Sequence, residues 1–181
     1  MNKIESPDEL LEYLREKKGF YGKKRANHVE LVLGYVIKIM EQLNIDDKGE
    51  ILQYAAVLHD MGRTDKVIKK YSEEPHEVYG AEYLLDKKKG IEILDKCGLK
   101  DDAECIAEYI RFHRTGKIDN KNSYIIMAAD KLAHYDKKPK RCDESLSAIE
   151  LIPYEDIKRC AISMAKDIAL KHEREKSKSK K

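Results

Sequence analysis

The stretch Ala55–Arg63 has the sequence AAVLHDMGR and is predicted to end a buried helix. Apolar residues from Ile51 onward recur at helical spacing, and Gly62 stands where the helix should stop. His59 falls on the apolar side of this helix, and Asp60 follows it directly. An imidazole and a carboxylate in a protein core are costly unless each finds a partner. The pair therefore indicates either an ion pair that closes a helix end or part of a larger polar site.

The composition favours a single helical domain. A chain of 181 residues is long enough for one domain with a sizeable core. Lys, Glu, Leu, Ile and Ala are frequent whereas there are only 4 prolines, and this bias favours helices. The sequence shows neither an internal repeat nor the alternation that is typical of strands. The predicted fold class is therefore all-α, with one helical bundle over residues 1–172.

Positive charge is concentrated at the end of the chain. The formal net charge is +2, yet the segment 171–181 alone carries six Lys or Arg against two Glu, so the rest is slightly acidic. A nearly neutral body argues against a dedicated nucleic-acid groove. Residues 173–181 are predicted to be a basic, disordered tail, for which contact with RNA is a weaker alternative to a solubilising role.

Nothing in the sequence indicates a membrane or an oxidising compartment. No apolar run is long enough for a membrane span, and the first residues lack the apolar core of a signal peptide. The four cysteines, Cys97, Cys105, Cys142 and Cys160, have no short paired spacing, so we interpret them as reduced structural thiols. We therefore expect a cytoplasmic protein.

Helices are predicted to begin near residues 7, 23, 51, 75, 91, 102, 122 and 153. The first starts with the capping pair Ser6-Pro7 and ends before Gly19, and the second runs from 23 to 43. The last is predicted to extend to about residue 171. The Lys-rich segment before it is predicted to contain only a short acidic turn.

Polar residues also interrupt the apolar faces of other predicted helices. His28, His113 and Asp130 each share a helical face with apolar residues. His76 opens a helix that contains the small pair Gly80-Ala81, where another backbone can approach closely. Several inward imidazoles and carboxylates need a common partner, and a transition metal satisfies them together. The pattern therefore predicts a metal site built from distant parts of the chain.

The order His28, His59-Asp60, Asp130 resembles the HD-domain superfamily, whose members are all-helical, metal-dependent phosphohydrolases. The additional His76 and His113 match the subset with two metals. The likeness covers about residues 23–141, so an HD-type helical bundle is the expected fold.

The closest likeness is to the small bacterial branch that cleaves diadenosine tetraphosphate symmetrically. In that branch Arg-x-x-His opens the motif, the second-metal histidine precedes Gly-Ala, a histidine precedes Thr-Gly and the last acid follows alanine. The matching segments here are Arg25–His28, His76–Ala81, His113–Gly116 and Ala129-Asp130. As an ordered set these motifs are specific, although each is weak alone.

The resemblance implies that His28, His59, Asp60 and Asp130 hold one metal ion and that Asp60, His76 and His113 hold a second. Asp60 and a metal-bound hydroxide would bridge the ions, and the hydroxide would attack phosphorus. Asp60 and Arg63 are thus the predicted catalytic residues. Iron or manganese suits mixed imidazole and carboxylate ligands, and magnesium, nickel, cobalt and zinc are also compatible.

Basic side chains near these motifs are candidates to bind a phosphorylated substrate, with an ordinary solvated surface charge as the alternative for each. The predicted substrate-binding residues are Arg25, Arg63, Arg114, Thr115, Lys117 and Lys131. His134 lies one helical turn after Asp130, where a structural role is favoured over support of a metal ligand.

Departures from the family pattern widen the range of expected substrates. Arg63 stands where relatives often have lysine, Arg114 stands where the closest relatives have threonine, and the segment after Asp130 is longer before Pro139 and Arg141. We predict an enzyme that hydrolyses a phosphoester or phosphoanhydride bond of a nucleotide or dinucleoside polyphosphate. The alternatives are an HD phosphodiesterase or nucleotide monophosphatase, and a non-catalytic nucleotide-binding HD domain. The oligomeric state is left open.

Overall fold

The computed structural model describes residues 3–46, 50–68, 74–86, 89–117, 119–137 and 142–178. Its regular structure over these ranges is helical, apart from one isolated bridge between Lys117 and Asn120. The elements are α1 (Pro7–Glu16), α2 (Lys23–Leu43), α3 (Ile51–Leu58), η2 (Met61–Arg63), α4 (Asp65–Ile68), α5 (His76–Leu85), α6 (Ile91–Lys96), α7 (Ala103–Phe112), α8 (Lys121–Lys137), α9 (Cys142–Glu150) and α10 (Glu155–Lys178). The all-α prediction is confirmed.

Local signals account for the ends of the first helices. The side chain of Ser6 accepts a hydrogen bond from the backbone N–H of Glu9 at 3.2 Å, and Pro7 occupies the first turn of α1. The helix α2 has the bounds predicted for it and ends at Asn44, whose left-handed conformation (φ 50°) is one that asparagine tolerates better than most residues.

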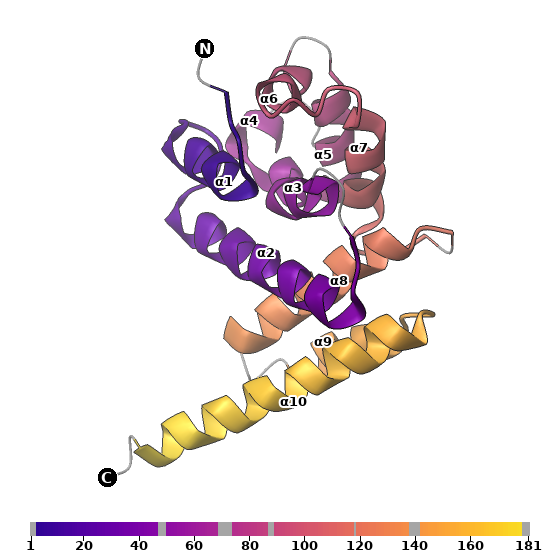
Figure 1. Ribbon diagram of the computed structural model, residues 1–181. Coiled ribbons are helices and arrows are strands. Elements are labelled where there is room, and N and C mark those ends of the chain that lie inside the picture. The colour runs from indigo at the N-terminus through magenta and orange to yellow at the C-terminus, as the bar shows by residue number, and fades with distance from the viewer. Residues whose placement is uncertain are drawn as a thin grey trace.

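Helix α3 lies at the centre of the bundle. It packs against α1, α2, α7 and α8, and Figure 1 shows it enclosed by neighbouring helices. Its side chains from Leu52 to Leu58 are buried, apart from Gln53, because a helix that is apolar on nearly every side has to be covered by other elements. The polar residues that follow α3 are thereby delivered into the interior.

Two glycines allow the turn after α3 to lie directly against α5. A Cβ atom on Gly62 would lie 1.8 Å from the carbonyl oxygen of His76, and one on Gly80 would lie 2.9 Å from the backbone nitrogen of Gly62. Neither position has room for a side chain, so η2 and α5 approach as closely as bare backbone allows. The close approach predicted at Gly80 is confirmed, and it brings Asp60 beside His76.

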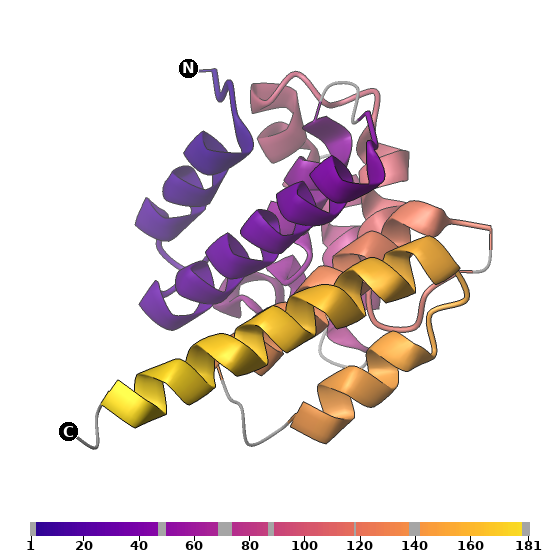
Figure 2. The ribbon, with the colours of Figure 1, turned by 60° about the horizontal axis from the view of Figure 1, so that its bottom comes forward.

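The C-terminal part of the chain differs from the prediction in two ways. Residues 142–150 form the helix α9, where only a short turn was predicted; Ile149 is buried on its inner face. Helix α10 lies across α2 and α8, with α9 beside it, as Figure 2 shows. It continues to Lys178, beyond the predicted end at 171.

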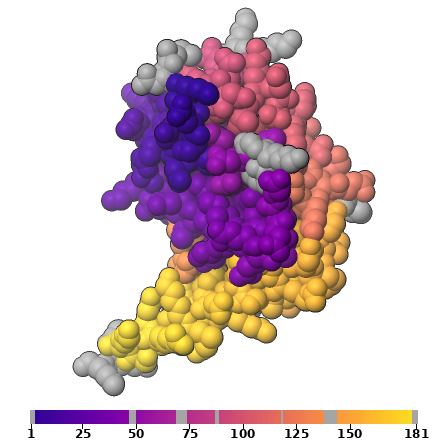
Figure 3. Space-filling model, in the orientation of Figure 1, coloured from indigo at the N-terminus to yellow at the C-terminus, as the bar shows by residue number. Residues whose placement is uncertain are grey.

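The end of α10 includes much of the predicted tail. Residues 173–178 are helical and exposed, and they project from the body of the molecule in Figure 3. Lys, Arg and Glu are good helix formers, and His172 and Glu175 lie one turn apart with Nδ1 and Oε2 3.7 Å from each other. Residues 179–181 lie outside the described ranges, and the division of the chain at 172 stays a prediction.

No helix in the described ranges combines the length and the apolar character that crossing a membrane requires. Cys97 and Cys160 are buried free thiols, as expected for structural cysteines, whereas the free thiol of Cys105 is exposed.

Candidate metal centre

The imidazole of His59 is fixed by the last turn of α3. Its Nδ1 lies 2.6 Å from the carbonyl oxygen of Ala56 and donates a hydrogen bond to it. The other ring nitrogen, Nε2, is buried and has no hydrogen-bond partner. Burial lowers the pKa of His59 below the ordinary value, because desolvation outweighs the attraction of Asp60 and Asp130. A neutral ring with Nδ1 protonated presents a lone pair on Nε2.

His113 repeats this arrangement at the end of α7. Its Nδ1 donates to the carbonyl oxygen of Ile110 at 2.6 Å, and burial lowers its pKa to about 3. The His113 ring lies edge-on to His59 and to His76, with ring centroids 5.2 and 5.4 Å apart. Three helix ends that are distant in sequence therefore bring their imidazoles together.

Asp60 lies between two groups of histidines, and each of its oxygens faces one of them. Oδ2 lies 3.9 Å from Nε2 of His59 and accepts a hydrogen bond from Nη1 of Arg25 at 2.5 Å. Oδ1 lies 3.4 Å from Nε2 of His76 and 2.9 Å from Nε of Arg63. Burial opposes the charged carboxylate, but these imidazoles and guanidiniums hold its pKa well below the usual value.

Asp130, on α8, joins the side of the cluster that contains His28. Its Oδ1 lies 3.0 Å from Nε2 of His28 and 3.9 Å from Nε2 of His59. Lys131 and His134 also lie close, with Nζ 3.4 Å from Oδ2 and Nε2 3.3 Å from Oδ1. Burial again opposes ionisation, and the hydrogen bond with His28 and the nearby positive charges lower the pKa of Asp130 below its usual value.

Three sets of side chains bring their ligand atoms within 4.8 Å of one another and could each hold a metal ion. They are His28–His59–Asp60, His28–Asp130–His134 and Asp60–His76–His113. The structure thus brings together all six residues predicted as ligands, each of them buried. The donor set fits a transition metal, and the unpartnered, buried Nε2 atoms of His59 and His76 are the atoms that such an ion would satisfy.

Only some of the predicted substrate-binding residues lie beside the clustered ligand candidates. Arg25 and Arg63 contact Asp60, and Lys131 contacts Asp130. Arg114 and Thr115 are exposed on the turn after α7; Nη1 of Arg114 lies 3.6 Å from Oε2 of Glu77. Lys117 instead lies beside Glu108, with Nζ and Oε2 3.3 Å apart, and over the ring of Phe112. Lys117 is therefore paired away from the six clustered ligand candidates.

The structure places two further residues, Glu77 and His134, at the cluster that the sequence patterns do not predict as ligands. Glu77 was not predicted, although it is only 6 % exposed and its Oε2 lies 2.9 Å from Nδ1 of His76. An acid directly after a candidate ligand, in the first turn of a helix, was the available signal. His134 was favoured as structural, yet it belongs to one of the three potential metal-binding sets and its ring centroid lies 4.6 Å from that of His28.

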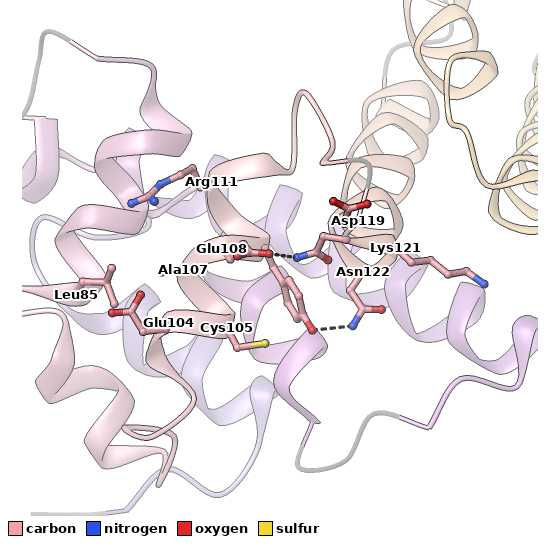
Figure 4. Close-up of a pocket in the computed structure, with 11 residues that line it drawn as sticks. Leu85, Glu104, Cys105, Ala107, Glu108, Arg111, Asp119, Lys121 and Asn122 are labelled. Atoms are coloured by element: carbon pink, nitrogen blue, oxygen red, sulfur yellow. Dashed lines mark hydrogen bonds between the residues drawn. The ribbon is translucent and has the colours of Figure 1, made fainter.

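A separate cleft of about 560 Å³ lies along the outer side of α7. Figure 4 shows its polar lining, in which Asn120 donates to Glu108 and Asn122 donates to Tyr109. None of the six clustered ligand candidates lines it. Some of its polar side chains pair with one another, although Nε of Arg111 is buried without a hydrogen-bond partner. The lining contains no histidine and none of the three potential metal-binding sets, so the histidine cluster is the stronger candidate for the reactive site.

A family model described as HD domain matches residues 25–135, which is more than half of the chain and includes all six ligand candidates. No curated protein and no solved structure matches the chain significantly.

Proposed function

Because the chain belongs to the HD domain family, we propose that it is a metal-dependent phosphohydrolase with a two-ion centre. The observation that carries the proposal is the position of Asp60, whose two oxygens face different histidines: Oδ2 lies 3.9 Å from Nε2 of His59 and Oδ1 lies 3.4 Å from Nε2 of His76. A carboxylate that has a histidine on each side is suited to bridging two cations. A single structural ion pair would need only one of these contacts.

In this proposal His28, His59, Asp60 and Asp130 hold one ion, and Asp60, His76 and His113 hold the other. When bound, the ions would lower the pKa of a water molecule and neutralise charge on the phosphate. Iron or manganese suits these mixed nitrogen and oxygen donors. The neutral state of His59 and His113, which burial favours, keeps their Nε2 atoms available as ligands.

Arg25 and Arg63 are the proposed phosphate-binding residues nearest the centre. Each now pairs with one oxygen of Asp60, at 2.5 and 2.9 Å. A cation bound to Asp60 would compete for the same oxygens, and a guanidinium released in this way can bind a phosphate in a bidentate manner. Arg63 is also the proposed catalytic cation, since its position three residues after Asp60 allows it to offset charge that develops on the phosphate.

For the substrate we propose a nucleotide or dinucleoside polyphosphate, with symmetrical cleavage of diadenosine tetraphosphate as the first compound to test. The support is the ordered set of motifs from Arg25 to Asp130 together with several cations near the cluster: Arg25, Arg63, Arg114 and Lys131. A polyphosphate carries more charge than one arginine offsets, so a group of cations suits it.

A phosphodiesterase or nucleotide monophosphatase is the second candidate. It is favoured by the ion pair between Arg114 and Glu77, whose Nη1 and Oε2 atoms are 3.6 Å apart, because this contact engages one of the cations that a long polyphosphate would need. A substrate with fewer phosphate groups needs fewer free cations.

The test is to purify the full chain, measure bound metal, and assay nucleotides, cyclic nucleotides and dinucleoside polyphosphates with manganese and with iron. We expect about two metal equivalents and hydrolysis of at least one class of compound. A protein that binds a nucleotide with unchanged affinity after Asp60→Ala, and hydrolyses none of these compounds, would instead be a non-catalytic binding domain.

We propose the cytoplasm as the site of action, since the buried thiols of Cys97 and Cys160 are free.

A further inference from the structure

Two of the clustered histidines are oriented by the same kind of hydrogen bond to the backbone. His59 and His113 each follow a helix and donate from Nδ1 to a carbonyl oxygen three residues earlier, at 2.6 Å in both cases. In a neutral imidazole only one nitrogen carries a proton, so this bond leaves Nε2 free to accept a cation. Any histidine that presents Nε2 to the centre needs an equivalent acceptor at Nδ1.

His76 cannot make this hydrogen bond to its own helix, because it is the first residue of α5 and does not follow the helix. No earlier turn of its own helix offers a carbonyl oxygen at the matching position. Its Nε2 nonetheless faces Oδ1 of Asp60 at 3.4 Å, and it is buried without a hydrogen-bond partner. The acceptor for Nδ1 must therefore come from another group.

Glu77 is placed to supply that acceptor. Its Oε2 lies 2.9 Å from Nδ1 of His76, on the opposite side of the ring from the contact with Asp60. The Oε2 atom is buried and makes no hydrogen bond, so it is available as an acceptor for Nδ1. Nη1 of Arg114, 3.6 Å away, supplies the positive charge that a buried carboxylate requires.

An ordinary structural role does not explain this placement. An acid in the first turn of a helix is stabilised by the helix dipole, but an exposed acid gains this as readily as a buried one. Glu77 is only 6 % exposed and its Oε2 lies 2.9 Å from Nδ1 of His76. The burial of the carboxylate and this short distance together indicate a role that involves His76.

We propose that Glu77 is a positioning residue that keeps His76 in the tautomer with a proton on Nδ1, so that Nε2 is presented toward Asp60. For its consequence in metal binding this inference rests on the proposed two-ion function. A carboxylate partner makes an imidazole more basic than a carbonyl partner does, and loss of such a partner typically weakens metal binding by about 10- to 100-fold. Glu77 would thus strengthen the set Asp60–His76–His113 in particular.

The first experiment needs no metal and no substrate. Full-length ¹⁵N-labelled protein, stripped with a chelator and held at about pH 8.5 so that histidines with ordinary pKa values are neutral, is examined by long-range ¹H–¹⁵N NMR. We expect the His76 ring to carry its proton on Nδ1 in the wild-type protein and in Glu77→Gln, whose amide oxygen can still accept. In Glu77→Ala the population with the proton on Nε2 should rise. Glu108→Ala, which removes an acid from the outer cleft, should leave the His76 signals unchanged.

The second experiment measures manganese binding to the same proteins by titration calorimetry and by metal analysis. In Glu77→Ala we expect one equivalent to bind 10- to 100-fold more weakly while the other is unchanged. A wild-type His76 protonated on Nε2 would overturn the inference, and this measurement does not depend on whether a variant folds. Tautomers that are the same in Glu77→Ala and wild type would also overturn it. If the tautomers are as expected but only one ion ever binds, Glu77 keeps its positioning role and the two-ion function is wrong.

Discussion

The imidazole rings of His59 and His113 have centroids 5.2 Å apart although the residues are 54 positions apart in the chain, and both rings donate from Nδ1 to the carbonyl oxygen three residues earlier. The shared bond leaves each Nε2 unprotonated at neutral pH, because burial lowers the pKa of both rings. Two buried imidazoles with the same unprotonated nitrogen could each bind a cation, whereas neither could donate a proton to the other through Nε2. The predictions below follow from this arrangement and from the contacts of Asp60.

Asp60→Ala should remove metal binding and hydrolysis together. The substitution removes the carboxylate that faces both His59 and His76, so we expect the bound metal to fall to near zero and kcat/KM to fall on the order of 1,000-fold or more. Metal analysis and steady-state kinetics measure the two effects, and circular dichroism checks that the helices persist. Asp156→Asn, which alters an exposed ion pair with Lys121, is the matched control. Full metal content in Asp60→Ala would contradict the proposed centre.

The metal-free protein should lose stability as the pH falls below about 6.5. At higher pH His59 and His113 are neutral in both the folded and the unfolded states, so they make no contribution to the pH dependence of stability. Below that value the unfolded chain takes up protons that folded His113, with a pKa of about 3, cannot bind. Each such group lowers the free energy of unfolding by up to about 1.4 kcal/mol per pH unit until the folded pKa is reached.

Asp60 and Asp130, whose pKa values are lowered in the folded state, act in the same direction but only below about pH 3.8. Urea denaturation between pH 8 and pH 4 in a chelator measures the histidine effect separately. A free energy of unfolding that is constant over this interval would show that His59 and His113 titrate normally. His113→Gln should reduce the slope.

Gly62→Ala should damage both the fold and the centre. The added Cβ would lie 1.8 Å from the carbonyl oxygen of His76, so η2 and α5 must separate. We expect a loss of about 1–3 kcal/mol in the free energy of unfolding and weaker binding of one metal ion, because Asp60 moves away from His76. Gly34→Ala is the control, since nothing lies within 4 Å of its added Cβ, and alanine should stabilise α2 by about 0.5–1 kcal/mol. Equal stability of the two variants would contradict the close approach.

Arg63→Ala and Lys117→Ala test whether the cation beside Asp60 supports hydrolysis more than a cation paired with Glu108 does. Nε of Arg63 lies 2.9 Å from Asp60, whereas Lys117 pairs with Glu108 on the outer side of α7. Removal of Arg63 should lower kcat/KM by about 10- to 1,000-fold, and removal of Lys117 should change it less than about twofold. Both variants should retain their metal. If the two losses are similar, the charge of the whole surface matters more than the position of Arg63.

Removal of residues 173–181 should leave hydrolysis intact. Residues 173–178 are exposed at the projecting end of α10 and are absent from the three potential metal-binding sets. We expect kcat and KM within about twofold of the full-length values, because the charge removed is screened over such a distance. A large rise in KM for an anionic substrate would assign the tail a role in binding.

Much of the fold could be predicted from short-range patterns. The bounds of α2, the cap at Ser6 and the all-α class follow from periodicity and end signals that act over a few residues. The helix α9 escaped prediction because its stability comes from burial of Ile149 in the bundle rather than from local signals. The predicted end of the last helix near residue 171 did not allow for the charged residues that continue α10 to Lys178.

For the candidate site, the sequence by itself determined the list of six ligand candidates, because a histidine or an acid on an apolar helical face is costly wherever the helix packs. Only the tertiary structure decided which atoms meet. It places a histidine beside each oxygen of Asp60. It also places Glu77 beside Nδ1 of His76, and Lys117 beside Glu108. The physical reason is the sequence distance over which the interactions act. Helix periodicity assigns a residue to a face through contacts within one turn. The direction of a ring nitrogen instead depends on partners dozens of residues away, which are brought close by packing such as that of Gly62 against Gly80.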